Sequence, residues 1–369
     1  MGCSLNDCLS FSNGKKYPNS KGNIPIYGGN GVLGYCEESN ASNCIIIGRV
    51  GAYCGSVYYE KGKSWVSDNA IMGSAKEGFD IRFLYYLLLT LNLQKRQQGT
   101  SQPLLTQGLL KSINIPRLPE ISTQRRVSSF LSLFDQKIEL NNLVNDYLAE
   151  IAIALFNKQC PQTKQLNAVL SNIAEITMGQ SPVGSSYNEE GNGVVFYQGR
   201  AEFGSFFPRR RLFTTEPKRM AREGDTLMSV RAPVGDLNVA NEDCCIGRGL
   251  AAIHSEGSQS FVHYLMRAQA KQLNSFNNNG TVFGSINGKA LKELPVFLPS
   301  NDAIASLDSL LEPIDMLIRR NDDEIQALEQ LRDALLPKLM SGEINVSEVE
   351  VPTQLNNHLS AILLSTRFS

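Results

Sequence analysis

Patterns that bind metal ions are scarce in this chain of 369 residues. There are three histidines, and the eight cysteines form no C-x-x-C pair, so the spacings typical of zinc sites and of thiol–disulfide motifs are absent. We therefore expect reduced thiols and no metal site.

Long apolar runs and cofactor motifs are also missing. No run could span a bilayer and the first eleven residues do not resemble a signal peptide, so we expect a cytoplasmic protein with no membrane contact. Neither a G-x-x-x-x-G-K-[ST] phosphate loop nor the Asn/Asp-Pro-Pro-aromatic motif of adenine methyltransferases occurs. Residues 29–34 satisfy G-x-G-x-x-G, but the polar segment that follows does not read as a helix. We expect no catalytic centre and no cofactor in this chain.

An excess of positive charge, typical of proteins that bind nucleic acids, is absent from the chain as a whole, whose net charge is −1. The average conceals a division, because residues 301–369 hold 12 acidic and 5 basic side chains, which leaves 24 acidic and 30 basic for residues 1–300. The first 300 residues are therefore mildly basic, and the length of the chain predicts at least two domains.

An internal repeat organises the chain. Residues 83–88 match residues 261–266 at an offset of 178, and residues 110–111 match residues 291–292 at an offset of 181. Upstream the offset varies, and there Arg49 and Arg231 take equivalent places before a glycine. Each copy reads as short strands around one helix, closed by prolines. We expect an α+β protein with mixed α/β domains at 1–120 and 161–300, similar in core and different in loops.

Two long helices are expected at 121–160 and 301–345, followed by a tail at 346–369. Apolar residues recur at alternating spacings of four and three from Val127 and again from Leu307, which predicts an antiparallel coiled coil with pseudo-twofold symmetry. Asn141 and Asn321 are equivalent seam positions that either meet and fix the register or lie at wet positions. Pro313 predicts a kink or a restart of the second helix.

Basic, amide and aromatic side chains that could contact DNA are found in both copies. The candidates are Lys15, Lys16, Arg49, Lys61, Lys63, Trp65 and Gln102 in the first copy, and Tyr197, Gln198, Arg200, Arg209, Arg210, Arg211, Arg231, Arg248 and Asn279 in the second. The run Arg209 to Arg211 is the strongest local signal, and its alternative is a solvated charged loop. Arg49 and Arg231 fit a phosphate contact or an internal ion pair, and Arg248 fits a structural or a DNA-facing role.

The order of short motifs in the second copy resembles a known family. Residues 179–182 (Gly-Gln-Ser-Pro), 196–199 (Phe-Tyr-Gln-Gly), 246–250 (Ile-Gly-Arg-Gly-Leu) and 279–281 (Asn-Gly-Thr), then a proline-closed strand and a long helix, resemble a target recognition domain of the DNA specificity subunit of type I restriction-modification complexes. The first copy departs from this pattern, with Gly-Lys-Lys-Tyr at 14–17 and Asp-Asn-Ala at 68–70.

The resemblance implies a division of labour between subunits. Each recognition domain would read one half of a bipartite target in double-stranded DNA, and the helices would act as the spacer. Two methyltransferase subunits would supply S-adenosylmethionine and adenine methylation, and two ATP- and Mg²⁺-dependent restriction subunits can join, so this chain would be non-catalytic. An apolar stripe of Leu140, Val144, Tyr147 and Ile151 would meet the methyltransferase or be covered by the second helix. The alternative is a tandem-domain scaffold for protein or glycan, with no role in DNA binding.

Overall fold

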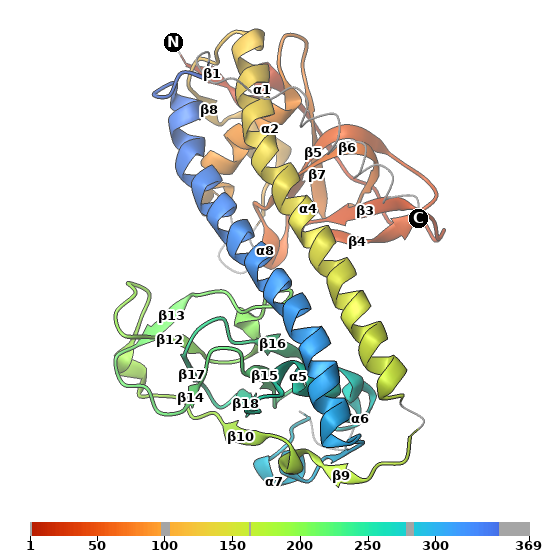
Figure 1. Cartoon of the computed structure of the whole chain (residues 1–369). Helices are drawn as coiled ribbons and strands as arrows, with labels where there is room; N and C mark the ends of the chain where they lie inside the picture. The colour runs from red at the N-terminus through yellow and green to blue at the C-terminus, as the bar shows by residue number, and fades with distance from the viewer. Residues whose placement is uncertain (1, 97–103, 162–163, 278–283, 347–369) are drawn as a thin grey trace. The chain divides into compact units, whose positions relative to one another are not determined.

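The computed structural model describes residues 2–96, 104–161, 164–277 and 284–346, which fall into two compact units. Unit 1 combines Met1–Ile138 with Ala327–Ser369, and unit 2 is Glu139–Gln326. The long helices α4 (Ile121–Gln159) and α8 (Asn301–Ser341) each contribute one part to each unit (Figure 1). The expected mixed α/β class is confirmed. No described helix is both long and apolar enough to cross a membrane.

Unit 1 is built on a six-stranded sheet. Its strands are β2 (Leu9–Asn13), β3 (Ile24–Gly28), β4 (Gly31–Cys36), β5 (Ala41–Gly48), β6 (Val57–Val66) and β7 (Ala70–Ala75). They lie in the order β2-β7-β5-β6-β3-β4, with β3 and β6 parallel and the other pairs antiparallel. The remaining elements are β1 (Cys3–Ser4), α1 (Leu5–Cys8), α2 (Ile81–Thr90), α3 (Gln107–Lys111) and β8 (Asn114–Ile115).

The sheet of unit 1 is covered on both faces, as β5 shows. Ile45 and Ile47 belong to the core that includes Phe83 of α2, whereas Cys44 and Ile46 belong to a second core on the other face. Alternate residues of a strand point to opposite faces, so a continuous apolar run is buried throughout.

Unit 2 contains two larger sheets. The first comprises β10 (Glu175–Met178), β15 (Thr226–Ser229), β16 (Leu237–Val239) and β18 (Leu250–His254) in the order β10-β18-β15-β16. The second comprises β11 (Tyr187–Asn188), β12 (Val194–Tyr197), β13 (Leu212–Thr214), β14 (Met220–Ala221) and β17 (Cys244–Ile246) in the order β11-β13-β12-β17-β14. The remaining elements are β9 (Ala168–Val169), α5 (Gln259–Ala268), α6 (Ala270–Ser275), α7 (Gly288–Lys292) and β19 (Pro295–Val296).

The same tyrosine–aspartate contact fixes the helix after the sheet against a long helix in both units. The Tyr86 hydroxyl donates to Asp135 of α4, and the Tyr264 hydroxyl donates to Asp315 of α8. Burial, the largest cause, raises the pKa of both tyrosines, so both stay protonated donors. In unit 1 Asp135 also pairs with Arg332 at 2.8 Å.

The register of the long helices differs from the sequence prediction. Asn321 donates to the side chain of Asn145 at 2.8 Å, and Asn141 donates to Glu324 at 2.8 Å, so Asn141 and Asn321 do not bond to each other. The heptad pattern identifies the facing side of each helix, but it does not fix how far one helix slides along the other.

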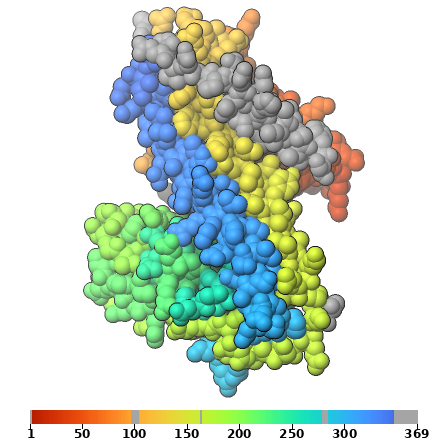
Figure 2. Space-filling view, viewed as in Figure 1, coloured from red at the N-terminus to blue at the C-terminus, as the bar shows by residue number. Residues whose placement is uncertain are grey.

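Pro313 does not restart the second helix, because α8 runs without a break from Asn301 to Ser341. Pro313 lacks an N–H group, which leaves the carbonyl of Ser309 without its helical partner. Both residues are exposed, so water can take the place of that partner. Residues of α8 form part of the surface that faces the viewer (Figure 2).

Candidate nucleic-acid interface

In unit 2, hydrogen bonds bring the ends of four strands together around the loop between β17 and β18. The N–H of Gly247 donates to the carbonyl of Tyr197 at 2.8 Å, and the N–H of Gln180 donates to that of Ile246 at 2.9 Å. The N–H of Val230 donates to the carbonyl of Gly249 at 2.9 Å. We call the side chains that emerge here junction 2: Gln180, Gln198, Arg231 and Arg248.

The four side chains of junction 2 are exposed. Among the described residues, none of them makes a recorded ion pair or side-chain hydrogen bond. Two guanidinium and two amide groups therefore offer fork-shaped donors to a ligand, which are the groups that chelate guanine and adenine edges in the major groove.

Glycines permit the close approach of these loops. A Cβ atom on Gly179 would lie 2.2 Å from the carbonyl oxygen of Gly247, and one on Gly249 would lie 2.9 Å from that of Gln198. Both obstacles are backbone atoms, so a side chain at either position would displace the loop.

The same hydrogen bonds recur in unit 1. The N–H of Gly14 donates to the carbonyl of Ala70 at 3.1 Å, and the N–H of Gly179 donates to the carbonyl of Leu250 at 2.9 Å. Three further N–H groups, those of Lys15, Ser67 and Arg49, repeat the bonds of Gln180, Gly247 and Val230. The positions equivalent to junction 2 are Lys15, Gly28, Val50 and Asp68, which we call junction 1. The backbone frame is shared and the exposed chemistry differs.

This register corrects the predicted equivalence of Arg49 and Arg231. The carbonyl of Arg49 accepts from Leu105 and that of Val230 accepts from Ile286, so Arg49 corresponds to Val230, and Arg231 to Val50. Arg49 is half-buried and its Nε atom has no hydrogen-bond partner, whereas Arg231 is exposed. The sequences align arginine with arginine, but the backbone is offset by one residue.

Tyr197 cannot contact DNA as predicted, because its side chain is 0% exposed and its hydroxyl donates to Asn241 at 3.2 Å. Burial raises its pKa and that of the neighbouring Cys244 thiol, so both groups stay protonated. Trp65 is half-buried, and its indole N–H donates to the carbonyl of Lys15 at 3.2 Å. This bond holds the backbone at Lys15 in junction 1.

The arginine run of unit 2 has partners within the unit. Arg210 pairs with Glu242 and Arg211 pairs with the buried Glu202, both at 2.5 Å. Arg209 is exposed and donates its backbone N–H to Glu202, and Arg200 pairs with Asp236 at 2.9 Å. These pairs favour a role in shaping the loop, and DNA contact by these arginines stays a prediction.

The remaining candidates divide into two groups. Lys15, Lys16, Lys61 and Lys63 are exposed. Gln102 and Asn279 lie outside the described residues. Gln180 and Asp68 were missed as site residues, although Gln180 lies in the motif Gly-Gln-Ser-Pro and Asp68 begins the segment Asp-Asn-Ala at 68–70.

Comparison with known proteins agrees with this architecture. Residues 4–149 match the family model "Type I restriction modification DNA specificity domain". The chain is 33% identical over 291 residues to the type I restriction enzyme MjaX specificity subunit of Methanocaldococcus jannaschii, covering 71% of this chain and 68% of that protein. It is 23% identical over 316 residues to the MjaIX specificity subunit of the same organism, covering 74% and 71%.

A solved structure shares the fold. The S subunit of a type I restriction-modification system from M. genitalium superposes with a TM-score of 0.60 at 16% identity, covering 92% of this chain and 96% of that one. At that identity the likeness concerns the fold alone. The sequence identity to the MjaX subunit, over 68% of its length, decides the family: this chain belongs to the type I restriction enzyme specificity subunits.

Proposed function

We propose that the chain is the sequence-specific DNA recognition subunit of a type I restriction-modification complex. One observation carries the proposal: the two units hold the same hydrogen-bonded loop frame but present different exposed side chains on it. Junction 2 offers two arginines and two glutamines, and junction 1 offers Lys15 and Asp68. Two frames with different donors and acceptors suit the reading of two different half-sites.

The finer organisation belongs to the same proposal. Each unit is a target recognition domain, in tandem at 1–120 and 161–300, and the helices at 121–160 and 301–345 form an antiparallel coiled-coil spacer that sets the gap between half-sites. The apolar cores in which Val127 and Leu131 join Leu336 and Leu339, and Ala152 and Phe156 join Leu307 and Leu311, support antiparallel packing.

The spacer also docks the methyltransferase subunits. Val144, Tyr147 and Ile151 of α4 are 38%, 46% and 52% exposed, so the second helix leaves this stripe accessible, while Leu140 is half-buried. Exposed apolar residues in a row mark a partner surface. Two methyltransferase subunits would supply S-adenosylmethionine and the methylation of adenine, two restriction subunits would supply ATP- and Mg²⁺-dependent cleavage, and this chain would be non-catalytic.

Co-expression with a cognate methyltransferase subunit, followed by mapping of methylated adenines across a genome, tests the proposal. A gapped motif of two unrelated halves is expected. Arg248→Ala should relax one half only, because a lost bidentate contact removes about 1–3 kcal/mol of base discrimination. Asp68→Ala should alter the other half. A continuous palindromic motif, or equal loss at all sites with either variant, contradicts two independent reading heads.

The triple variant Arg209→Ala, Arg210→Ala and Arg211→Ala separates two roles of the arginine run. Base contacts would change one half of the motif, whereas phosphate contacts would lower methylation equally at all sites. The scaffold alternative is tested by DNA binding of the chain with its methyltransferase at low and moderate salt. A steep loss of affinity with salt is expected, and undetectable or salt-insensitive binding would favour the scaffold.

A further inference from the structure

A polar cavity in unit 1 lies apart from junction 1, on the helix side of the sheet. Its volume is about 550 Å³, and its walls come from β5 and β6, from the start of α2 and from the first turns of α4. The residues that matter for its chemistry are Tyr59, Lys61, Arg82, Arg125 and Ser129. None of these residues belongs to junction 1.

The cavity carries three cations and one acid. Lys61 and Arg125 are exposed, and the Arg82 guanidinium lies over the Tyr59 ring at 5.5 Å from its centre. Among the described residues, no ion pair of Lys61, Arg82 or Arg125 is recorded. The one acid, Asp80, accepts the N–H of Phe83 at 2.8 Å as a helix cap and is therefore engaged.

The fold does not require these cations, as unit 2 shows. Ile45 of β5 and Thr226 of β15 are equivalent, because each lies four residues before the equivalent pair Arg49 and Val230. Ile45 pairs with Tyr59 and Thr226 pairs with Val239, so Val239 takes the place of Tyr59, and Asn241 takes the place of Lys61. At the repeat offset of 178, Ser260 replaces Arg82. At the offset of 180 that relates the helix seams from Val127 and Leu307, Ala305 replaces Arg125. At these three positions the charge is therefore found in unit 1 and not in unit 2.

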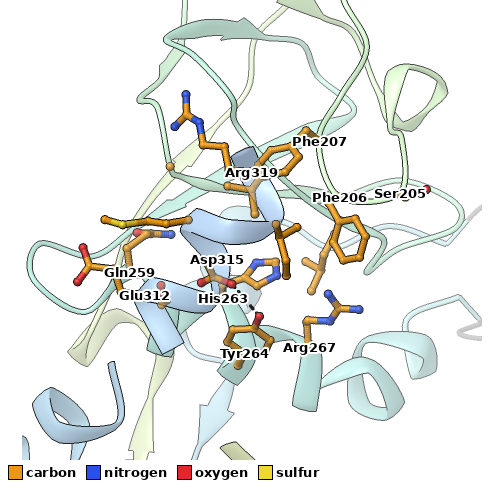
Figure 3. Close-up of a pocket in the computed structure, with 16 residues that line it drawn as sticks. Ser205, Phe206, Phe207, Gln259, His263, Tyr264, Arg267, Glu312, Asp315 and Arg319 are labelled. Carbon is orange, nitrogen blue, oxygen red and sulfur yellow. Dashed lines mark hydrogen bonds between the residues drawn. The ribbon is translucent and has the colours of Figure 1, made fainter. Parts of the chain in front are cut away.

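The matching region of unit 2 is a smaller, more apolar pocket of about 160 Å³ (Figure 3). Phe206 and Phe207 line it, and Arg319, which also lines it, is bound to Glu223 at 2.5 Å. His263 in its wall is neutral, because burial lowers its pKa to about 3. This pocket has no surplus of positive charge at the equivalent positions.

We propose that the cavity of unit 1 binds a phosphate group through Lys61, Arg82 and Arg125. Two guanidinium groups and an ammonium group line the same cavity, and the Ser129 hydroxyl adds a further donor. Phosphate suits this set because it accepts several charge-assisted hydrogen bonds at once. The phosphate belongs either to a free phosphorylated metabolite or to the backbone of bound DNA, and only the second source rests on the proposed function.

The test compares two adjacent arginines of α4. Arg125 lines the cavity, whereas Arg126 is also exposed and does not line it, so Arg125→Gln and Arg126→Gln remove the same charge one residue apart. Lys61→Gln and Lys63→Gln form a second pair on β6. The full chain is titrated calorimetrically with inorganic phosphate and with ATP, and the complex with its methyltransferase is titrated with target duplex over a range of salt.

Three outcomes decide the matter. Binding of phosphate or ATP that falls about tenfold in Arg125→Gln but not in Arg126→Gln supports a free-anion site. No free-anion binding, but a salt slope for duplex that falls by about 0.9 in Arg125→Gln alone, supports a backbone contact. Equal effects of the two arginine variants, or none, overturn the proposal, while duplex binding by the wild-type complex leaves the proposed function standing.

Discussion

A single methyl group at Gly179 should disturb the reading of one half-site and leave the other intact. The added Cβ atom would lie 2.2 Å from the carbonyl oxygen of Gly247 and 2.8 Å from that of Ile246. Ordinary contact begins near 3.4 Å, so the loop that carries Arg248 has to move by about 1 Å, at a cost of about 1–3 kcal/mol. A displacement of that size removes the alignment that bidentate base contacts need.

The repeat supplies the matching variant. A Cβ atom on Gly14 would lie 1.9 Å from the carbonyl oxygen of Ser67, the residue equivalent to Gly247, so Gly14→Ala disturbs junction 1 in the same way. Gly184→Ala and Gly34→Ala are the controls, because an added Cβ atom meets nothing within 4 Å at either glycine.

Methylated adenines are mapped for each variant, co-expressed with the methyltransferase. Gly179→Ala should relax one half of the motif by about tenfold or more in discrimination per base, Gly14→Ala the other half, and both controls should match the wild type. The reasoning is refuted if either variant folds normally and keeps the full motif, or if both variants change the same half.

Three further outcomes follow from the described contacts. Arg332→Ala leaves Asp135 with the Tyr86 hydroxyl as its partner. The side chains of Arg332 and Asp135 are 22% and 33% exposed, so the variant should lose about 2 kcal/mol of unfolding free energy. Denaturant titration measures the loss, with Arg126→Ala, at an exposed position, as the control. Burial, the largest cause, raises the pKa of Asp315, so the stability that this carboxyl contributes is present below the unfolded pKa of 3.8 and is lost as pH rises through the folded pKa. The unfolding midpoint of the wild type should therefore fall between pH ~3 and ~6, and Asp315→Asn should remove this fall. An unchanged pH profile in Asp315→Asn would contradict the reasoning. Tyr197→Phe should lower stability by about 1 kcal/mol and leave the methylated motif unchanged, whereas Gln198→Ala should alter one half of it; an altered motif with Tyr197→Phe would return that residue to the interface.

Sequence patterns predict the elements of this fold well where one periodicity persists over many residues. Seam positions such as Leu131 and Leu307 are buried, and the run at 44–47 forms a strand buried on both faces. The vertical register of the helices could not be predicted, because sliding one helix past the other keeps the same residues in the seam. The contact of Asn321 with Asn145 instead of Asn141 is such a slide.

The candidate site was harder to predict, because composition does not tell which face of a strand a residue occupies. Tyr197 and Gln198 are neighbours in the sequence, yet the first is 0% exposed and the second belongs to junction 2. The role of the arginine run could not be decided from the sequence, because its partners Glu202 and Glu242 lie 9 and 32 residues from Arg211 and Arg210. Hydrogen bonds between loops, which only the structure supplies, identify Gln180 and Asp68.

The frame of the junctions rests almost wholly on main-chain hydrogen bonds and on glycines, which explains how the two units keep one frame with different exposed residues. An exposed side chain on such a frame can change without breaking a bond of the frame, and surface substitutions of this kind alter stability by about 0.5 kcal/mol or less. Gly28 is left unchanged, because a Cβ atom there would lie 2.4 Å from the Cδ1 atom of Leu33 and that exposed side chain would have to turn away. The triple variant Lys15→Gln, Val50→Arg and Asp68→Arg should therefore unfold at the wild-type denaturant midpoint while changing one half of the methylated motif. A large loss of stability would show instead that these side chains hold the frame, and junction 1 would then be a structural corner and not a reading head.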